Sequence, residues 1–148
     1  SLLGVLGRLS EERPVLFPVH PRTRGRIAEF GLEAALTRYP GLRLTDPLGY
    51  LDFMRLLDDS ELVLTDSGGI QEETTVLGVP CLTLRPNTER PITITHGTNE
   101  LVGTDPETIL SAGLAILAGR KKSGETPPLW DGHAAERIAA ILAERAGT

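Results

Sequence analysis

The chain has 148 residues, of which 40% are hydrophobic and 24% are charged, and its formal net charge is −5. A chain of this length and composition is expected to fold as a single globular domain around one core. The acidic balance argues against a nucleic-acid-binding surface, because a phosphate backbone calls for a broad field of Lys and Arg. The apolar runs fall well short of the roughly 18–20 residues of a membrane-spanning helix, so we expect no membrane span.

The first third of the chain predicts two helices and two strands. Residues 2–9 are apolar at helical spacing without a preceding cap, and we expect them to be the end of a helix in a longer protein. The compact apolar run 14–20 predicts a strand buried on both faces. Residues 23–39 predict a helix that breaks at Gly31, and Leu42–Thr45 predicts a second short strand.

The rest of the chain continues this alternation. In chain order we expect helix Tyr50–Asp58, strand 62–65, helix Gly68–Leu77, strand 80–84, an edge strand 100–103, helix Pro106–Leu117 and helix 134–145. Strands that alternate with helices across short links predict an α/β fold with a Rossmann-like, doubly wound parallel sheet covered on both faces. In such sheets ligands bind beyond the carboxyl ends of the strands.

Two segments are predicted to lack regular structure. Two prolines stiffen the charged loop 85–91, and a long ordered loop of this kind is typically functional. Residues 121–128 are predicted to form a flexible polar link. The single cysteine, Cys81, lies in an apolar segment, where it is expected to be a small buried hydrophobe in a reducing cytoplasm.

The turn formed by Ser67, Gly68 and Gly69 joins a predicted strand to a predicted helix. The first N–H groups of a helix have no intrahelical acceptor and lie at the positive end of the helix dipole, and two glycines leave a ligand free to approach them. Such helix ends bind phosphate. Glycines also serve strand-to-helix turns for geometry alone, so the turn by itself leaves both interpretations open.

Two charged side chains favour the phosphate interpretation. Arg90 follows the next predicted strand, and its guanidinium offers a fork of donors that suits two phosphate oxygens. The alternative is a surface ion pair of Glu89 with Arg85 or Arg90. Glu73 lies four residues after Gly69, on the same helix face and one turn deeper, where a carboxylate could accept hydrogen bonds from ribose hydroxyls. Acidic residues early in a helix also occur simply because they suit the dipole.

A basic cluster occupies residues 20–26, which contain His20 and three arginines at the start of a predicted helix. Cations at this position oppose the helix dipole, so we expect something to compensate them. One interpretation is a solvated basic turn. The other is a contact with an anion or with an acidic neighbouring domain.

Several catalytic motifs do not fit. The run from Asp66 to Gly69 is similar to the nucleophile segment of trypsin-like serine proteases, but that fold consists of β-barrels. A Gly-x-Ser-x-Gly elbow fails because Thr65 occupies the first glycine position. No predicted strand is followed by Gly-x-Gly-x-x-Gly, and no His or Cys pair has metal-ligand spacing. We therefore expect neither a metal nor a cofactor.

Taken together, the motifs resemble those of the C-terminal domain of the non-hydrolysing UDP-N-acetylglucosamine 2-epimerases. The specific signals are the Thr-Asp-Ser-Gly-Gly-Ile-Gln-Glu-Glu run at 65–73 and the Thr-Glu-Arg-Pro run at 88–91. Further matching segments are 20–24, 47–53, 78–80, Arg85, 97–99 and 101–103. Ile92 departs from the pattern, because many members have an acidic residue after Arg-Pro, and this leaves the exact sugar open.

The resemblance implies a fold of the GT-B type, with a UDP-sugar between two Rossmann-like halves. Residues 1–148 would form the second, UDP-binding half, with the N-terminal domain absent from this chain and a homodimer when full length. Matching positions would assign Ser67, Gly68 and Gly69 to the diphosphate and Arg90 to phosphate. The same comparison would assign Glu73 to the ribose, Leu48 and Phe53 to the uracil end, and His20 to the cleft lining.

The implied reaction interconverts UDP-N-acetylglucosamine and UDP-N-acetylmannosamine in cell envelope polysaccharide biosynthesis. UDP would be eliminated to leave a 2-acetamidoglucal and then added back on the other face of the sugar. The family's acid/base carboxylates and its Thr-x-His-Arg-x-Glu-Asn motif do not occur in this sequence, so we expect weak UDP binding and no epimerisation by the chain alone. A GT-B glycosyltransferase domain and a stand-alone nucleotide-sugar-binding module are the alternatives.

Overall fold

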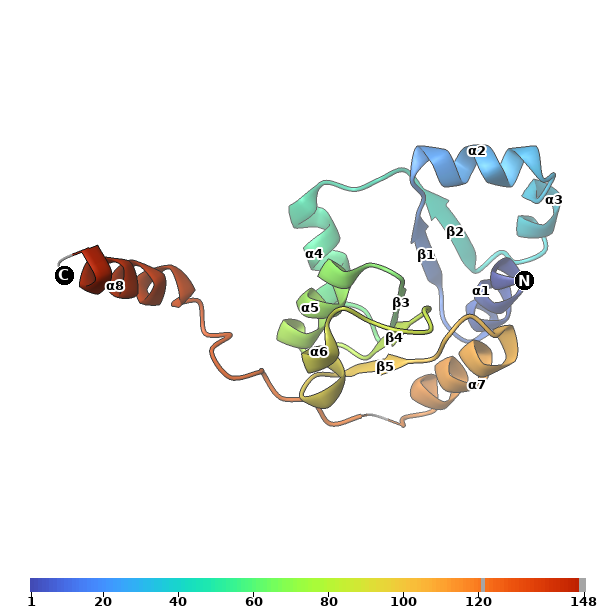
Figure 1. Ribbon diagram of the computed structural model, residues 1–148. Coiled ribbons are helices and arrows are strands. Elements are labelled where there is room, and N and C mark those ends of the chain that lie inside the picture. Colours follow the sequence, from blue (N-terminus) through green and yellow to red (C-terminus); the bar gives the residue numbers. More distant parts are fainter. Residues whose placement is uncertain (121, 147–148) are drawn as a thin grey trace.

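The computed structural model describes residues 1–120 and 122–146, and Figure 1 shows the arrangement of the elements. The helices are α1 (Leu2–Glu12), α2 (Pro21–Glu29), α3 (Glu33–Leu36), α4 (Tyr50–Asp58), α5 (Gly68–Leu77), α6 (Pro91–Thr95), α7 (Pro106–Leu117) and α8 (Ala134–Ala146). The strands are β1 (Val15–Pro18), β2 (Leu42–Thr45), β3 (Val63–Thr65), β4 (Cys81–Thr83) and β5 (Asn99–Leu101).

All of the strand pairs in the described residues are parallel, which confirms the predicted α/β class. The strands form two sheets, one in the order β1-β2 and the other in the order β3-β4-β5. The sequence predicted a single doubly wound sheet. In the described residues no hydrogen-bonded ladder joins β1 to β3, so the strands form two sheets instead. β1 and β3 are therefore edge strands of two separate sheets.

Helices cover the strands from two sides (Figure 1). On one side α1 packs against α7, and Val5, Leu9 and Ile109 form a buried cluster that also contacts Val15 of β1 and Leu64 of β3. On the other side α4 and α5 pack together over a second cluster built from Leu57, Val63 and Val79. Parallel sheets require such covering on both faces, because their strands are apolar on both sides.

Local sequence signals set most helix ends. The Asp105 side chain accepts a hydrogen bond from the Thr108 backbone N–H at 2.8 Å and caps α7, which begins with Pro106. Gly78 ends α5 in the left-handed region at φ 72°, a conformation that glycine adopts without steric cost. Gly31, at φ 61°, separates α2 from α3, as the sequence predicted.

The structure corrects two local expectations and adds two features that the sequence did not indicate. The strand predicted to be buried on both faces, β1, leaves the Leu16 side chain 46% exposed. Helix α2 begins at Pro21 rather than residue 23, because His20 caps it. The sequence did not predict α6, which follows Arg90 directly. Helix α8 occupies its predicted place but has no buried residue and stands apart from the body (Figure 1). Lys121, the first residue of the predicted link, lies outside the described residues.

Candidate functional site

The turn between β3 and α5 presents backbone donors to solvent. Ser67 is the N-cap of α5, yet its side chain makes no capping hydrogen bond, and its own N–H donates to Thr65 Oγ1 at 3.0 Å. Ser67 and Gly69 are exposed and Gly68 is half-buried. The first N–H groups of this ten-residue helix therefore face an open surface at the positive end of its dipole.

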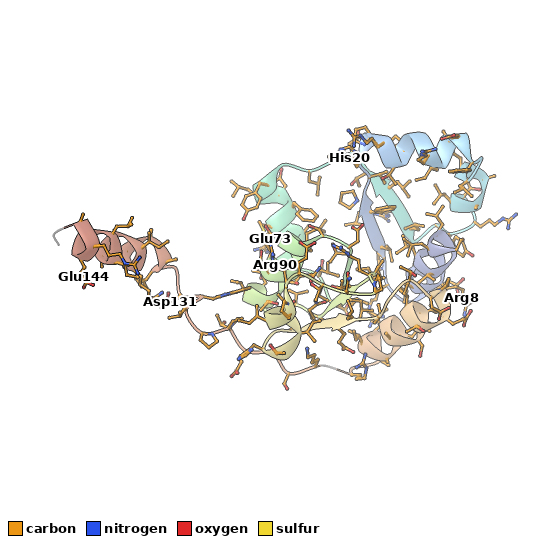
Figure 2. The ribbon with its side chains drawn as sticks, viewed as in Figure 1. Arg8, His20, Glu73, Arg90, Asp131 and Glu144 are labelled. Carbon is orange, nitrogen blue, oxygen red and sulfur yellow. The ribbon has the colours of Figure 1, made fainter. Side chains whose placement is uncertain are left out.

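Arg90 lies beside this turn, as predicted (Figure 2). A methyl group added at Gly68 would come within 3.8 Å of Arg90 Cγ and 3.9 Å of Nε. Arg90 Nε lies 2.9 Å from Glu72 Oε1 without making a well-aligned hydrogen bond, so the contact is an ion pair and the buried Nε–H keeps donor capacity. The partner of Arg90 is Glu72 of α5, whereas the sequence alternative named Glu89.

A buried hydrogen-bond chain fixes the loop that carries Arg90. The Thr88 hydroxyl donates to Gln71 Oε1 at 2.6 Å and accepts from the Arg90 backbone N–H at 3.0 Å. The Gln71 side chain is completely buried within α5. Helix α5, which begins at the glycine turn, therefore also fixes the backbone of Arg90 through Gln71 and Thr88.

Asn99 of β5 extends the same network. Its side-chain amide donates to Gln71 Oε1 at 3.3 Å and to Thr93 Oγ1 at 3.1 Å, while its Oδ1 accepts from Thr83 Oγ1 at 2.7 Å. The Thr93 hydroxyl in turn donates to the Arg90 carbonyl at 2.7 Å. The network joins α5, the Arg90 loop, α6 and β5 through Gln71 Oε1, while the buried Gln71 Nε2 makes no hydrogen bond within the described residues.

The sequence analysis missed Gln71, Thr88 and Asn99 as supporting residues. A signal was present, because Gln71, Thr74 and Thr75 occupy i, i+3 and i+4 positions of α5 and all three are buried. Buried polar side chains need hydrogen-bond partners. Thr74 and Thr75 find theirs in backbone carbonyls of α5 itself, whereas the Gln71 amide needs partners from other elements. Pairing that stripe with Thr88 and Asn99 needed the tertiary structure.

Glu73 lies on α5 one turn after the glycines, as expected, and is half-buried. Within the described residues its carboxylate makes no hydrogen bond or ion pair. Its neighbour Glu72 instead pairs with Arg90. The two adjacent glutamates thus differ, since one holds the arginine and the other leaves both carboxylate oxygens available as acceptors.

His20 is placed differently from the other candidates. It is exposed at the end of β1, and its Nδ1 accepts the Arg22 backbone N–H at 3.3 Å, which makes it the N-cap of α2. Figure 2 shows it well apart from Glu73 and Arg90. Two of the neighbouring arginines are compensated by acids, because Arg24 pairs with Asp46 at 3.0 Å and Arg26 pairs with Glu29 at 2.8 Å.

Leu48 and Phe53 both belong to the segment around α4. Leu48 is 41% exposed in the turn before the helix. Phe53 is half-buried and packs against the cluster formed by Leu57, Val63 and Val79. Helix α4 packs on α5, and Leu48 lies in the turn that leads into α4, whereas the Phe53 ring packs against the core cluster.

Three of the predicted parts of the site therefore lie together in the structure, namely the glycine turn, Arg90 and Glu73. Leu48 precedes a helix that packs on α5, and His20 lies at the end of the other sheet. An N-terminal helix end with an adjacent guanidinium can hold a phosphate or diphosphate. Among the described residues, no group of three or more His, Cys, Asp or Glu could hold a metal ion. No helix in that part of the chain is long and apolar enough to cross a membrane.

Comparison with known proteins places this geometry in context. A family model described as UDP-N-acetylglucosamine 2-epimerase matches residues 1–143. UDP-N-acetylglucosamine 2-epimerase of Methanocaldococcus jannaschii is 43% identical over 131 residues. UDP-2,3-diacetamido-2,3-dideoxy-D-glucuronate 2-epimerase of Pseudomonas aeruginosa is 40% identical over 131 residues. Each match covers 88% of this chain but only 35% of the relative.

A solved structure agrees with the sequence matches. The crystal structure of the Methanocaldococcus jannaschii UDP-GlcNAc 2-epimerase in complex with UDP-GlcNAc and UDP superimposes with a TM-score of 0.83 at 39% identity. The match covers 97% of this chain and 40% of that structure. The fold is therefore that of a Rossmann-like half of a GT-B protein, and this chain spans about two fifths of the solved relative.

Proposed function

Because the chain belongs to the UDP-N-acetylglucosamine 2-epimerase family, we propose that it is the UDP-binding half of an epimerase acting on a UDP-sugar. The observation that carries the proposal is the meeting of the open α5 N-terminus with Arg90. Both groups supply N–H donors and positive charge to one place, which suits a diphosphate. The relatives with UDP and UDP-GlcNAc in their names support the choice of UDP.

The proposed roles follow from the geometry. Ser67, Gly68 and Gly69 would donate backbone N–H groups to the diphosphate, and the Arg90 guanidinium would turn from Glu72 to the phosphate oxygens. Glu73, with both oxygens available, would accept hydrogen bonds from the ribose hydroxyls. The turn before α4 would place Leu48 and the neighbouring backbone of Phe53 at the uracil end. His20 would line the cleft from the other sheet.

These residues would act on the leaving group of the proposed reaction. In the elimination step a proton leaves C2 of the sugar and the C1–O bond breaks, so that negative charge grows on the departing UDP and a 2-acetamidoglucal remains. A helix dipole and a guanidinium aimed at that charge stabilise the transition state. Readdition of UDP to C1 and protonation of C2 on the opposite face complete the epimerisation. The proton-transfer groups would come from parts of the relatives that this chain does not match.

The proposal extends to the sugar of the substrate and to the cellular compartment. We favour UDP-N-acetylglucosamine, although the matched Pseudomonas aeruginosa relative is named for a diacetamido glucuronate substrate. Ile92, which follows Arg90-Pro91 in the sequence, is a half-buried apolar residue in the first turn of α6. A reducing cytoplasm suits the buried free thiol of Cys81.

A thermal-melt titration tests the proposal. A ligand that binds only the native state stabilises it by about 2.7 kcal/mol at 100 times its dissociation constant. For a domain of this size the gain corresponds to a rise in Tm of roughly 5–10 °C. We expect a saturable rise with millimolar UDP and little or none with uridine, because uridine lacks the diphosphate.

Two arginine variants make the titration specific. Arg90→Ala should abolish most of the rise with UDP. Arg8→Ala is the matched control, since Arg8 is an exposed residue that pairs with Glu11 on α1, away from the site (Figure 2). Equal responses of the two variants would contradict the proposed phosphate role of Arg90, and a folded chain without any response to UDP would contradict the function.

A further inference from the structure

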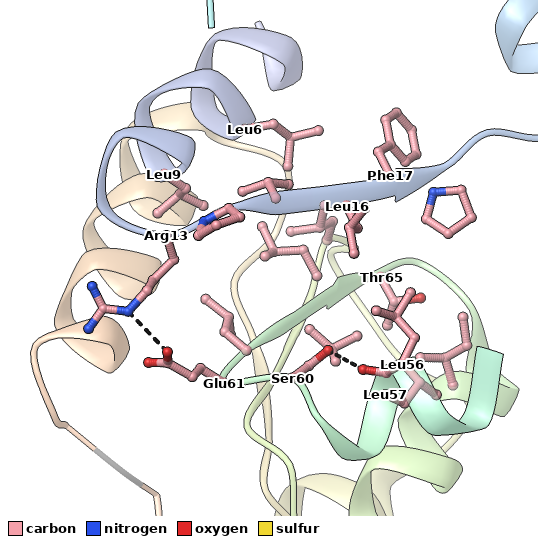
Figure 3. A pocket seen from close by; sticks show the side chains of 18 of the residues that line it. Leu6, Leu9, Arg13, Leu16, Phe17, Leu56, Leu57, Ser60, Glu61 and Thr65 are labelled. Carbon is pink, nitrogen blue, oxygen red and sulfur yellow. Dashed lines mark hydrogen bonds and ion pairs between the residues drawn. The ribbon is translucent and has the colours of Figure 1, made fainter. Parts of the chain in front are cut away.

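The two edges of the β3-β4-β5 sheet differ in the structure. The β3 edge borders a mainly apolar hollow of about 760 Å³, whose lining includes Leu6, Leu9 and Leu16 (Figure 3). The β5 edge is instead covered by residues 122–127, which belong to the segment that the sequence predicted as a flexible polar link. Figure 1 shows the chain running from α7 past β5 and α6 before it reaches α8.

The strap, residues 122–127, is held against the body of the domain by close contacts. The Glu125 N–H donates to the His96 carbonyl at 2.8 Å. Gly124 lies so close to Thr98 that an added methyl group would come within 2.8 Å of the Thr98 backbone nitrogen. Pro127 is fully buried. The structure therefore replaces the predicted flexible link with a segment that is fixed to the fold.

Lys122 of the strap makes two bonds to backbone carbonyls. Its Nζ donates to the carbonyl of Asn99 in β5 at 2.7 Å and to the carbonyl of Ile94 in α6. Val102 donates its N–H to Thr83 of β4, and alternate residues of a strand direct their backbone groups to opposite sides, so the Asn99 carbonyl lies on the outer edge of the sheet. Ile94 lies in the last turn of α6, where carbonyls have no intrahelical donor. One ammonium group thus pairs two carbonyls that the regular elements leave free.

The ammonium group of Lys122 is partly withdrawn from water. Lys122 is half-buried, and this burial lowers its pKa, an effect that the nearby Glu100 carboxylate partly offsets. Glu100 also pairs with Arg120 at 3.0 Å. Hydrogen bonds from a charged donor are stronger than neutral ones, and partial burial strengthens them further. We therefore expect the two carbonyl bonds to hold the end of α6 firmly against β5.

A short chain of hydrogen bonds connects Lys122 to Arg90. The side-chain amide of Asn99 donates to Thr93 Oγ1 at 3.1 Å, and the Thr93 hydroxyl donates to the Arg90 carbonyl at 2.7 Å. Arg90 is also the N-cap of α6, the helix whose last turn Lys122 contacts. Both routes end on the backbone of Arg90, where Thr88 accepts a hydrogen bond from the N–H.

We propose that Lys122 is a positioning residue for the candidate phosphate site, because it fixes α6 on β5 and thereby holds Arg90 beside the glycine turn. The inference rests on the proposed UDP-binding function. Helix α6 has only five residues, and an isolated helix this short is not stable in water, so its place depends on tertiary contacts. Without the ammonium group, α6 would lose the contact at its end, and Arg90 would leave its place beside Gly68 for part of the time.

A substitution that removes only the charged end of the side chain tests the proposal. Lys122→Met keeps an unbranched chain of similar length but has no donor. We expect the Kd for UDP, measured by amide NMR titration well below Tm, to rise about three- to tenfold, within the range for residues joined by one hydrogen-bond network. Leu114→Ala is the control for lost stability, because Leu114 packs against the cluster of α1 and α7; it should lower Tm and leave the Kd unchanged.

A double-mutant cycle separates positioning from simple stabilisation. In an Arg90→Ala background, Lys122→Met should change the Kd by less than about twofold, because the ammonium group acts through Arg90. The ligand-free spectrum adds a measurement that does not depend on UDP. The side-chain Nε–H signal of Arg90 should move in Lys122→Met and stay in place in Leu114→Ala. If Lys122→Met does not fold, Lys122→Gln, which is uncharged and one bond shorter than lysine, takes its place with the same expectations.

The outcomes distinguish this inference from the function on which it rests. An original chain that does not bind UDP would remove the proposed function, and the role of Lys122 would then stand or fall with the Arg90 Nε–H signal in the ligand-free spectrum. The inference is overturned if the Lys122 variant leaves both the Kd and that signal unchanged, or if Leu114→Ala has the same effects. It is also overturned if the rise in Kd is as large without Arg90 as with it.

Discussion

Thr88→Val removes the hydroxyl that links the arginine loop to α5 while keeping the size and branching of the side chain. The hydroxyl donates to Gln71 Oε1 at 2.6 Å and accepts from the Arg90 N–H at 3.0 Å. After the substitution, Gln71 Oε1 retains only the longer bond from Asn99 at 3.3 Å, and the Arg90 N–H loses its acceptor. The variant thus loosens the backbone of Arg90 without changing the charge of its side chain.

The expected cost comes from these two contacts. Each neutral hydrogen bond contributes about 0.5–1.5 kcal/mol, so the pair contributes about 1–3 kcal/mol to the free energy of unfolding. At roughly 2–4 °C per kcal/mol for a domain of this size, Tm should fall by about 2–12 °C. Because the Arg90 backbone loses the hydrogen bond that holds it, the stabilisation by UDP should also weaken.

The assay is the same thermal melt with and without UDP, applied to Thr88→Val and to Thr88→Ser. Serine keeps the hydroxyl and serves as the matched control. We expect Thr88→Ser to stay near the original chain in both measurements and Thr88→Val to lose stability and UDP response together. If the two variants have the same Tm and the same response, the Thr88 hydroxyl does not position Arg90.

Two further predictions follow from single residues. Glu72→Gln removes the carboxylate that competes with phosphate for Arg90. Since a partly exposed ion pair is worth about 0.2–1 kcal/mol, the Kd for UDP should fall by about 1.4- to fivefold. Glu89→Gln is the control, and weaker binding by Glu72→Gln would contradict the reasoning. Burial raises the pKa of the Cys81 thiol from 9.0 to about 11. The native thiol should therefore resist Ellman's reagent at pH 8, whereas the urea-unfolded chain reacts. The free energy of unfolding should also decline from pH 9 to about 11, where only the unfolded thiol ionises, and Cys81→Ala should remove that decline.

Short-range signals made most of the elements predictable. Asp105 with Pro106 marked the start of α7, and Gly78 marked the end of α5, because caps and left-handed positions restrict the residue types. The positions of the glycine turn and Arg90 followed from the rule that functional loops gather at the carboxyl ends of parallel strands. The presence of Arg90 beside Gly68 in the structure agrees with that rule.

The remaining features depend on contacts between distant segments. Leu16 looked like a core residue because its strand is apolar, yet its exposure is set by the space beside β1. The choice of Glu72 over Glu89 as the partner of Arg90 depends on how the loop crosses α5. The buried role of Gln71 likewise needed Thr88 and Asn99, which lie 17 and 28 residues away in sequence. Local patterns cannot specify such pairings.

The most direct measurement of the central claim is a two-dimensional amide NMR titration of the chain with UDP and, separately, with uridine. The account predicts that UDP shifts the backbone amide signals of Ser67, Gly68 and Gly69 and the side-chain Nε–H signal of Arg90, and that uridine leaves them in place. UDP-induced shifts that bypass all four residues, in a folded chain, would contradict it.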